Sequence, residues 1–156
     1  MRLLFAFLAI LCSQAHAQTD EAQPVETSKT FGNYAVFYNA FPSTTLLPAV
    51  AADYKIERGK NIAFINIAVR NHTNNGDIAQ AVTINGTYSD LMQKRPLEFR
   101  EIREQNAIYY IAQVRYDNRE VLRFDVQVQP QLHAGESPPI GSPFKISFTR
   151  KFFTEP

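Results

Sequence analysis

Residues 61–70, N-I-A-F-I-N-I-A-V-R, decide the fold class of this chain. Apolar and polar side chains alternate along this stretch, which is the period of two that a half-buried β-strand shows. Asn66 and Arg70 lie on the polar parity. The apolar parity consists of Ala63, Ile65, Ile67 and Val69. The stretch therefore predicts a strand with one face in a core and the other toward solvent.

The residues after this strand predict a hairpin. The segment H-T-N-N-G-D at residues 72–77 contains Asn75-Gly76, and both residues of that pair tolerate the positive φ of a tight turn. We expect the second strand at residues 78–88. A further pair, Asn85-Gly86, lies inside it, so this element is either one bulged strand or two short strands.

Residues 97–104, L-E-F-R-E-I-R-E, fit either a strand or a helix, because their apolar side chains satisfy both spacings. The neighbouring segment at residues 107–116, A-I-Y-Y-I-A-Q-V-R-Y, alternates and is rich in aromatic and β-branched residues, which favour strands. Only the short Glu104-Gln105-Asn106 separates the two segments. We therefore predict a second hairpin.

Two further strands are predicted toward the C-terminus. The run V-L-R-F-D-V-Q-V-Q-P at residues 121–130 alternates until Pro130 ends it. The run F-K-I-S-F-T-R-K-F-F at residues 144–153 also alternates over its first half. The loop between them contains three prolines and two glycines, which are too many helix and strand breakers for a packed element.

Upstream of residues 61–70, the aromatic run F-G-N-Y-A-V-F-Y-N-A-F at residues 31–41 predicts the first strand. In the segment that follows, Ser43 or Thr44 is suited to cap a helical turn, and Pro48 is suited to the first position of another. We expect one short helix or a pair of turns at this point of the chain.

About seven short strands joined by turns, without any long helical period, predict one all-β domain over residues 31–156. An antiparallel immunoglobulin-like or fibronectin-like β-sandwich, with one short helix after the first strand, fits this order of elements. The cysteine pair and tryptophan of antibody domains are missing, so the likeness is one of architecture. A β-barrel is the alternative.

The first 17 residues have the three parts of a cleavable signal peptide: a cation at Arg2, an apolar run, and the triplet Ala15-His16-Ala17. We predict cleavage after Ala17, followed by a disordered leader at residues 18–30. The apolar run is too short to span a membrane, so no stable membrane insertion is expected after cleavage. A lipoprotein anchor at Cys12 is the alternative, but the preceding residue is Leu11 rather than a small one.

Charge and cysteine content exclude several roles for the mature chain. Removing Arg2 leaves as many basic as acidic residues, 15 of each, so no bulk field attracts nucleic acid or anionic lipid. Cys12 is the only cysteine, so the mature chain has no disulfide and no thiol nucleophile. A secreted domain without disulfides is typical of the periplasm of Gram-negative bacteria, where we expect this protein.

The remaining residues predict no catalysis and no cofactor. His72, His133 and Met92 stand apart in the sequence, which offers no metal-binding motif and no acidic calcium loop. No serine lies in a Gly-x-Ser-x-Gly frame, and no glycine-rich phosphate loop is present. We predict that the protein is not an enzyme. A hydrolase with a dispersed site is the remote alternative.

The run Y-N-A-F-P-S-T at Tyr38 to Thr44 resembles a family of small secreted Gram-negative proteins that is classed as a domain of unknown function. The resemblance covers the chain from about Thr30 onward, and the chain departs from the family mainly in the proline-rich loop before the last strand. It implies a sandwich fold and a periplasmic location, and it brings no assigned activity. Further matching residues are Leu47, Pro48, Val50, Ala51, Tyr54 and Arg58.

The same run has a structural and a functional interpretation. As structure, Asn39 and Ser43 would satisfy backbone groups where the first strand turns into the helix. As function, it would belong to a polar recognition site beside Phe41, formed by Asn39, Phe41, Ser43, Thr44, Arg58 and Lys60.

Aromatic residues at adjacent positions, such as Tyr109-Tyr110 and Phe152-Phe153, place apolar groups on both faces of the sheets. They either complete the core or form an exposed patch that binds a partner. We predict a protein-protein interaction module that binds another envelope protein. The alternative is a carrier with a small-ligand pocket between the sheets.

Overall fold

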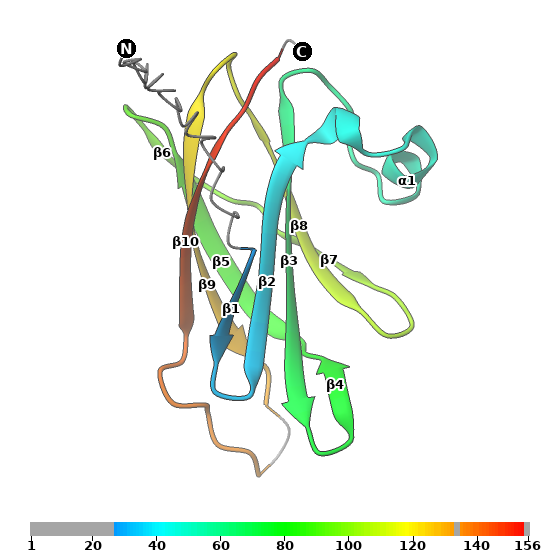
Figure 1. Cartoon of the computed structure of the whole chain (residues 1–156), viewed down its shortest axis with the longest axis vertical. Coiled ribbons are helices and arrows are strands. Elements are labelled where there is room, and N and C mark those ends of the chain that lie inside the picture. Colours follow the sequence, from blue (N-terminus) through cyan, green and yellow to red (C-terminus); the bar gives the residue numbers. More distant parts are fainter. Residues whose placement is uncertain (1–26, 133–134, 155–156) are drawn as a thin grey trace, which may run out of the picture.

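The computed structural model describes residues 27–132 and 135–154, which fold into two antiparallel sheets stacked face to face (Figure 1). In the larger sheet the strand order is β1-β2-β3-β8-β7, and β4 also pairs with β3. Its strands are β1 Ser28–Phe31, β2 Tyr34–Pro42, β3 Ile62–Thr73, β4 Gly76–Ala79, β7 Arg100–Arg103 and β8 Ile108–Arg115. The smaller sheet, in the order β10-β9-β5-β6, has β5 Val82–Ser89, β6 Lys94–Pro96, β9 Val121–Pro130 and β10 Phe144–Lys151.

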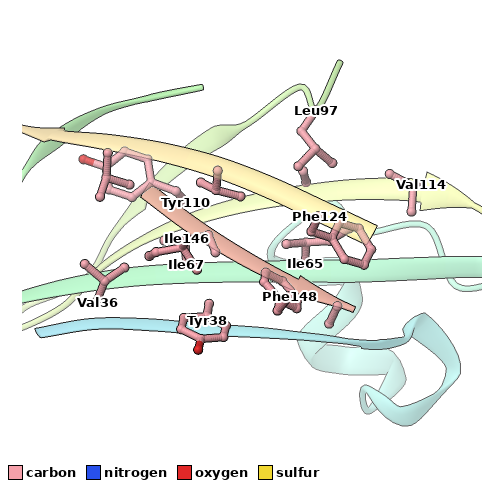
Figure 2. Packing of buried hydrophobic residues seen from close by; sticks show 14 of the residues in the cluster. Val36, Tyr38, Ile65, Ile67, Leu97, Tyr110, Val114, Phe124, Ile146 and Phe148 are labelled. Carbon is pink, nitrogen blue, oxygen red and sulfur yellow. The ribbon is translucent and has the colours of Figure 1, made fainter. Parts of the chain in front are cut away.

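Side chains from the facing sides of the two sheets form the main core. In the larger sheet this face includes the apolar parity of β3, whose four side chains are fully buried, as the alternation predicts. Tyr38 of β2 packs its ring against Phe148 of β10, with 4.9 Å between the ring centroids, and Phe148 stacks on Phe124 at 5.0 Å. Figure 2 shows this packing around Val36, Tyr38, Ile65, Ile67, Leu97, Tyr110, Val114, Phe124, Ile146 and Phe148.

The sandwich prediction is confirmed, but the described residues contain ten strands rather than about seven. The expected first strand at residues 31–41 is a hairpin, because Gly32 adopts a φ of +57° and turns β1 into β2. The leader was predicted to extend to Thr30, and this is wrong for Ser28–Thr30, which pair with β2. Residues 1–26, with the predicted signal peptide and the rest of the leader, lie outside the described residues.

The predicted strand at residues 78–88 is divided between two strands, which is one of the two alternatives given by the sequence. Asn85-Gly86 lies inside β5, which is one continuous strand. The division comes instead at residues 80–81, where the chain leaves β4 in the larger sheet and enters β5 in the smaller one. Gly86 is required inside β5, because a Cβ there would lie 2.9 Å from the backbone oxygen of Asp125 on β9.

Residues 94–103 are also divided between the sheets. β6 pairs with β5 in the smaller sheet, whereas β7 forms the predicted hairpin with β8 in the larger one. The strand interpretation of this segment is therefore confirmed for Arg100–Arg103, and Leu97 joins the main core between the two strands. No helix within the described part of the chain is long and apolar enough to cross a membrane.

The segment between β2 and β3 contains the expected short helical elements. A 3-10 turn, η1, spans Ser43–Thr45, and α1 spans Pro48–Asp53 with the proline at its first turn, as predicted. Ser43 does not cap a helix, and its hydroxyl bonds to the backbone of Gly59 instead. We call residues 43–61 the insertion. It lies at the end of the larger sheet where β2 finishes and β3 begins (Figure 1).

Candidate binding site

The insertion is folded back on itself by side-chain contacts to its own backbone. The Ser43 hydroxyl donates to the carbonyl oxygen of Gly59 at 3.3 Å and accepts the Gly59 N–H at 3.0 Å. The Arg58 guanidinium donates to the carbonyl oxygen of Thr44 at 3.0 Å. These bonds join the beginning of the insertion to its end, so α1 and the residues after it are held close to the sheet.

The insertion covers part of the outer face of the larger sheet, which is the face that points away from the main core. Ala51 and Ile56 of the insertion are buried together with Phe64 of β3 and Ile111 of β8. Phe64 and Ile111 occupy the parities opposite to the core-facing side chains of their strands. The result is a second apolar cluster, separate from the main core. Its partly buried members are Phe41, Leu46, Tyr54, Ile102 and Tyr109.

A pocket of about 310 Å³ opens beside this second cluster. We call it the outer pocket. Its walls come from β2, β3, β7, β8 and the insertion, and they are mainly apolar. The rings of Phe41 and Phe64 lie 5.1 Å apart at 54° to each other and give one wall an aromatic surface. The full lining is Phe41, Leu46, Val50, Tyr54, Ile56, Phe64, Asn66, Ile102, Glu104, Tyr109 and Ile111.

Three polar side chains contribute to this lining. Tyr54 donates its hydroxyl hydrogen to Oε1 of Glu104, so these two groups satisfy each other at one side of the pocket. Asn66 lies on β3, opposite Asn39 of β2 and Ile111 of β8. The Oδ1 atom of Asn66 is buried and has no hydrogen-bond partner. A buried acceptor in this state is uncommon, because most buried polar atoms are paired.

Hydrogen bonds from the sheet to the insertion fix the wall of the pocket. The Gln113 amide accepts the Glu57 N–H at 3.1 Å and donates to the Glu57 carbonyl oxygen at 2.8 Å. The Arg100 guanidinium donates to the carbonyl oxygen of Tyr54 at 2.6 Å. Since the backbone at Tyr54 and Glu57 is anchored to β7 and β8, the apolar side chains between these points have defined positions.

The structure brings Thr44 and Arg58 of the predicted recognition site into contact, but of its six residues only Phe41 lines the outer pocket. Phe41 lines the outer pocket, whereas Ser43 is fully buried and holds the insertion together. Asn39 is exposed, and its Oδ1 accepts the N–H of Ala40 at 2.9 Å. Thr44, Arg58 and Lys60 are exposed outside the pocket lining.

Sequence reasoning missed most of the pocket, including Phe64, Asn66 and Ile111. One signal for it was present. Phe64 and Ile111 are large apolar residues on the solvent-facing parity of strands whose other parity is already apolar. Such residues indicate that a second element covers that face. Tyr110 and Phe152 complete the main core, while their neighbour Tyr109 contributes to the pocket and Phe153 is about half exposed.

The described residues contain no cluster of side chains suited to metal binding. Within residues 27–132 and 135–154, no three His, Cys, Asp or Glu side chains are close enough to hold a metal ion. His72 is exposed and its Nδ1 lies 2.6 Å from Oδ1 of Asp77 at the β3-β4 hairpin. His133 lies outside the described residues.

Comparisons with known proteins identify a family and a fold. Residues 28–155 match the model of DUF4426, a domain of unknown function. A crystal structure of a DUF4426 family protein from Pseudomonas aeruginosa aligns with this chain at a TM-score of 0.64 and 30% sequence identity. The alignment covers 85% of this chain and 98% of that protein. The predicted resemblance to a family of unknown function is therefore confirmed.

The fold is also shared with FetP of uropathogenic Escherichia coli. The protein as isolated after expression in the E. coli periplasm aligns at a TM-score of 0.55 and 13% identity, over 83% of this chain and 94% of FetP. A copper-bound variant aligns at 0.52 and 14% identity, over 80% and 93% of the two chains. At these identities the likeness concerns the fold alone. No curated protein matches this chain.

Proposed function

Because this chain belongs to the DUF4426 family, a domain of unknown function, its role has to be argued from its own surface, and we propose a non-enzymatic binding protein of the periplasm. The outer pocket receives an apolar side chain of another envelope protein. The observation that carries this proposal is the apolar pocket of about 310 Å³ on a sheet face that would otherwise be polar.

The surface beside the pocket favours a protein as the occupant. Phe37 is 45% exposed and pairs in register with Ala68, which in turn pairs with Tyr109 of the pocket lining. A second hollow of about 260 Å³ lies along these residues. The pocket and this neighbouring strip together offer an anchor site surrounded by apolar contact area, which is the usual arrangement at protein interfaces.

A small-ligand carrier is the alternative. The main core fills the space between the sheets with side chains such as Phe124 and Phe144, both 0% exposed, so a carrier would have to use the outer pocket instead. That volume is at the lower end of the roughly 300–1,000 Å³ typical of ligand pockets, which bury most of their ligand. A half-open pocket of this size suits one or two side chains of a partner better than an enclosed metabolite.

Photo-crosslinking in intact cells tests the proposal. A photoreactive amino acid at Phe37 should form crosslinks to a protein partner. Adding Ile102→Glu, which places a carboxylate in the apolar lining, should reduce these crosslinks at least about tenfold, because a charge enters such a site only at high cost. Ile78→Glu is the matched control, since Ile78 is exposed on another strand of the same sheet and is outside the outer pocket.

Equal crosslinking in both glutamate variants would reject the outer pocket as the binding site. The absence of any protein crosslink, together with a small molecule that co-purifies with the wild type and is lost with Ile102→Glu, would favour the carrier.

A further inference from the structure

Strand β10 is the longest edge strand in the part of the chain that the structure describes. It lies at one end of the smaller sheet and pairs there with β9 alone (Figure 1). β10 has eight residues, whereas β1, β4, β6 and β7, which also pair on one side, have three or four. Short edge strands protect a sheet against pairing with other chains, and β10 lacks this protection.

The section of β2 that extends beyond β1 is blocked, in contrast to β10. The N–H of Tyr38 donates to the carbonyl oxygen of Thr27, so the even-numbered residues of β2 direct their backbone groups to this edge. The N–H of Ala40 is already bonded to Oδ1 of Asn39 at 2.9 Å. Pro42 has no N–H to donate. This edge therefore offers few groups to a further strand.

Half of the backbone groups of β10 point away from β9. Just after the strand, the N–H of Phe152 donates at 2.8 Å to the carbonyl oxygen of Glu120, which precedes β9. Backbone direction alternates along an antiparallel strand, so the even-numbered residues of β10 bond to β9 and the odd-numbered ones face outward. The outward residues, whose side chains are exposed, are Lys145, Ser147, Thr149 and Lys151. An extended segment can bond to these residues in turn.

Positive charges lie along this edge. Lys145 and Lys151 are close to the two ends of β10, and both side chains are exposed. Lys29 of β1 adds a cation near the first end. Its Nζ lies 5.4 Å from the centre of the Phe31 ring, which stacks on Phe144 of β10 at 4.5 Å. An acidic segment along β10 would therefore meet a cation at each end.

The carboxylates beside β10 on the smaller sheet are already engaged. Asp125 of β9, which pairs in register with Ser147, accepts hydrogen bonds from Arg123 and from the Ser147 hydroxyl. The carboxylate of Glu120 accepts the N–H of Asp117 at 2.6 Å. In a symmetric pairing of two β10 strands, lysines would face lysines. The edge therefore disfavours a second copy of itself and favours an acidic segment.

We propose that β10 accepts an extended acidic segment of another protein as an additional antiparallel strand. This inference goes beyond the proposed function, because β10 belongs to the smaller sheet and the outer pocket to the larger one. The orientation follows the other strand pairs of the smaller sheet, which are all antiparallel. Acidic side chains opposite Lys145 and Lys151 would lie on the exposed face of this sheet, and apolar side chains would alternate with them.

Two peptides of opposite charge test the charge preference. Acetyl-E-V-T-V-T-V-E-amide places a glutamate opposite each lysine, and acetyl-K-V-T-V-T-V-K-amide differs only in the sign of the charges. Dissociation constants are measured by NMR from the shifts of the outward amides of β10 as each peptide is added to the folded protein. We expect the acidic peptide to bind about tenfold more tightly, because two attractive exposed pairs replace two repulsive ones.

N-methylation separates strand addition from charge attraction alone. In the antiparallel pairing, the N–H of the third peptide residue donates to β10, whereas the N–H of the fourth points away. Methylation of the third residue of the acidic peptide should weaken binding at least about tenfold, since it removes a hydrogen bond and places a methyl group against the edge. Methylation of the fourth residue is the matched control and should have little effect.

Variants of the protein assign the binding to this edge. Replacing both lysines together, Lys145→Glu with Lys151→Glu, should reverse the preference in favour of the lysine peptide. Lys55→Glu is the control, because Lys55 is exposed in the insertion on the other sheet. Ile102→Glu, which alters the outer pocket, should also leave peptide binding unchanged, so the two proposals can fail separately.

Equal binding of the two charged peptides, or an equal effect of the two N-methyl groups, would overturn this inference. A dimer of the free protein that protects the outward amides of β10 from hydrogen exchange would assign the edge to a second copy. Binding of the acidic peptide only after removal of residues 18–26 would assign it to the chain's own N-terminal segment. Each of these outcomes rejects a partner strand at β10 and leaves the proposed function standing.

Discussion

At the scale of single residues, Ser43 shows how a polar side chain is used for structure inside an apolar environment. It is the only fully buried polar residue in the part of the chain that the structure describes. Its hydroxyl both donates to and accepts from the backbone of Gly59, which lies 16 residues further along the chain. The structural interpretation of Ser43 therefore has direct support, whereas Phe41 in the same run lines the outer pocket.

Replacing Ser43 should loosen the insertion. Ser43→Ala leaves both polar groups of the Gly59 backbone without this partner, so we expect a loss of about 1–3 kcal/mol in the free energy of unfolding. Urea denaturation measures this change. Thr44→Ala, at an exposed neighbouring position, is the control and should change the stability by less than about 0.5 kcal/mol. Equal effects of the two substitutions would contradict this account of Ser43.

Residue types and their order predict which side chains of the strands face the core, because the period of a strand is two and one face is buried. They do not predict that Asn66 belongs to the lining of a pocket. Its neighbours in the sequence, Ile65 and Ile67, face the other way, and the pocket that Asn66 lines also takes residues from β2, β7, β8 and the insertion. Only the register of β2, β3 and β8 brings them together.

At the scale of elements, the insertion depends on the sheet for its position. α1 has only six residues, which is too short for a stable isolated helix. It is held by burial of Ala51 and Ile56 and by the two hydrogen bonds between Gln113 and the Glu57 backbone. Here a side-chain amide substitutes for the main-chain pairing that a neighbouring strand would supply. The helix is therefore a consequence of tertiary packing.

Removing the Gln113 amide should release this anchor. In Gln113→Ala the Glu57 N–H loses its acceptor, so its hydrogen exchange should become at least about tenfold faster, while the amides of β9 should keep their protection. Hydrogen-exchange NMR measures both. Gln127→Ala removes an exposed amide from the smaller sheet and serves as the control. Unchanged exchange at Glu57 would show that apolar burial alone holds the insertion.

Element boundaries were harder to predict than element types. The sequence predicts strands at residues 78–88 and 97–104. The first segment is divided between β4 of the larger sheet and β5 of the smaller one. In the second segment only Arg100–Arg103 forms a strand, β7, and the residues before it link β6 to β7. At residues 80–81, where the chain passes from the larger sheet to the smaller one, the sequence contains neither proline nor glycine. The chain changes sheets there because β4 ends at Ala79, and Val82 begins the pairing of β5 with β9.

At the scale of the whole molecule, Tyr110 connects the two sheets through one hydroxyl group. It lies on β8 of the larger sheet, accepts the buried N–H of Val82 on β5 at 2.8 Å and donates to Oε2 of Glu101 at 2.8 Å. Burial, with a smaller contribution from the hydrogen bond to Glu101, raises the pKa of Tyr110 to about 12, although the hydrogen bond from the Val82 N–H opposes this shift. The hydrogen bond from Arg103, followed by that from Tyr110, lowers the pKa of Glu101.

This connection predicts a loss of stability in alkaline solution. Because the folded pKa of Tyr110 lies above its ordinary value of 10, the stabilisation by the neutral phenol is complete below about pH 10 and is lost as the pH rises through 12. We expect the difference in unfolding free energy between wild type and Tyr110→Phe to decrease by about 1–2 kcal/mol over this range. Urea denaturation at a series of pH values measures it.

The same variant should already be less stable at neutral pH by about 1–3 kcal/mol, because the Val82 N–H is left buried without a partner. Tyr34→Phe is the control, since Tyr34 is only partly buried and packs through its ring against Phe144. If Tyr34→Phe and Tyr110→Phe respond alike to pH, the hydroxyl of Tyr110 is not the connection between the sheets.

The sequence by itself determined the all-β class, the core-facing parity of the strands, the short helix after β2 and the family. Each of these follows from local periodicity or from a run of neighbouring residues. Only the tertiary structure decided the outer pocket, its unpaired Asn66 and the division of neighbouring strands between two sheets. The physical reason is that a pocket is made by side chains from distant segments, whose register and packing no local pattern specifies.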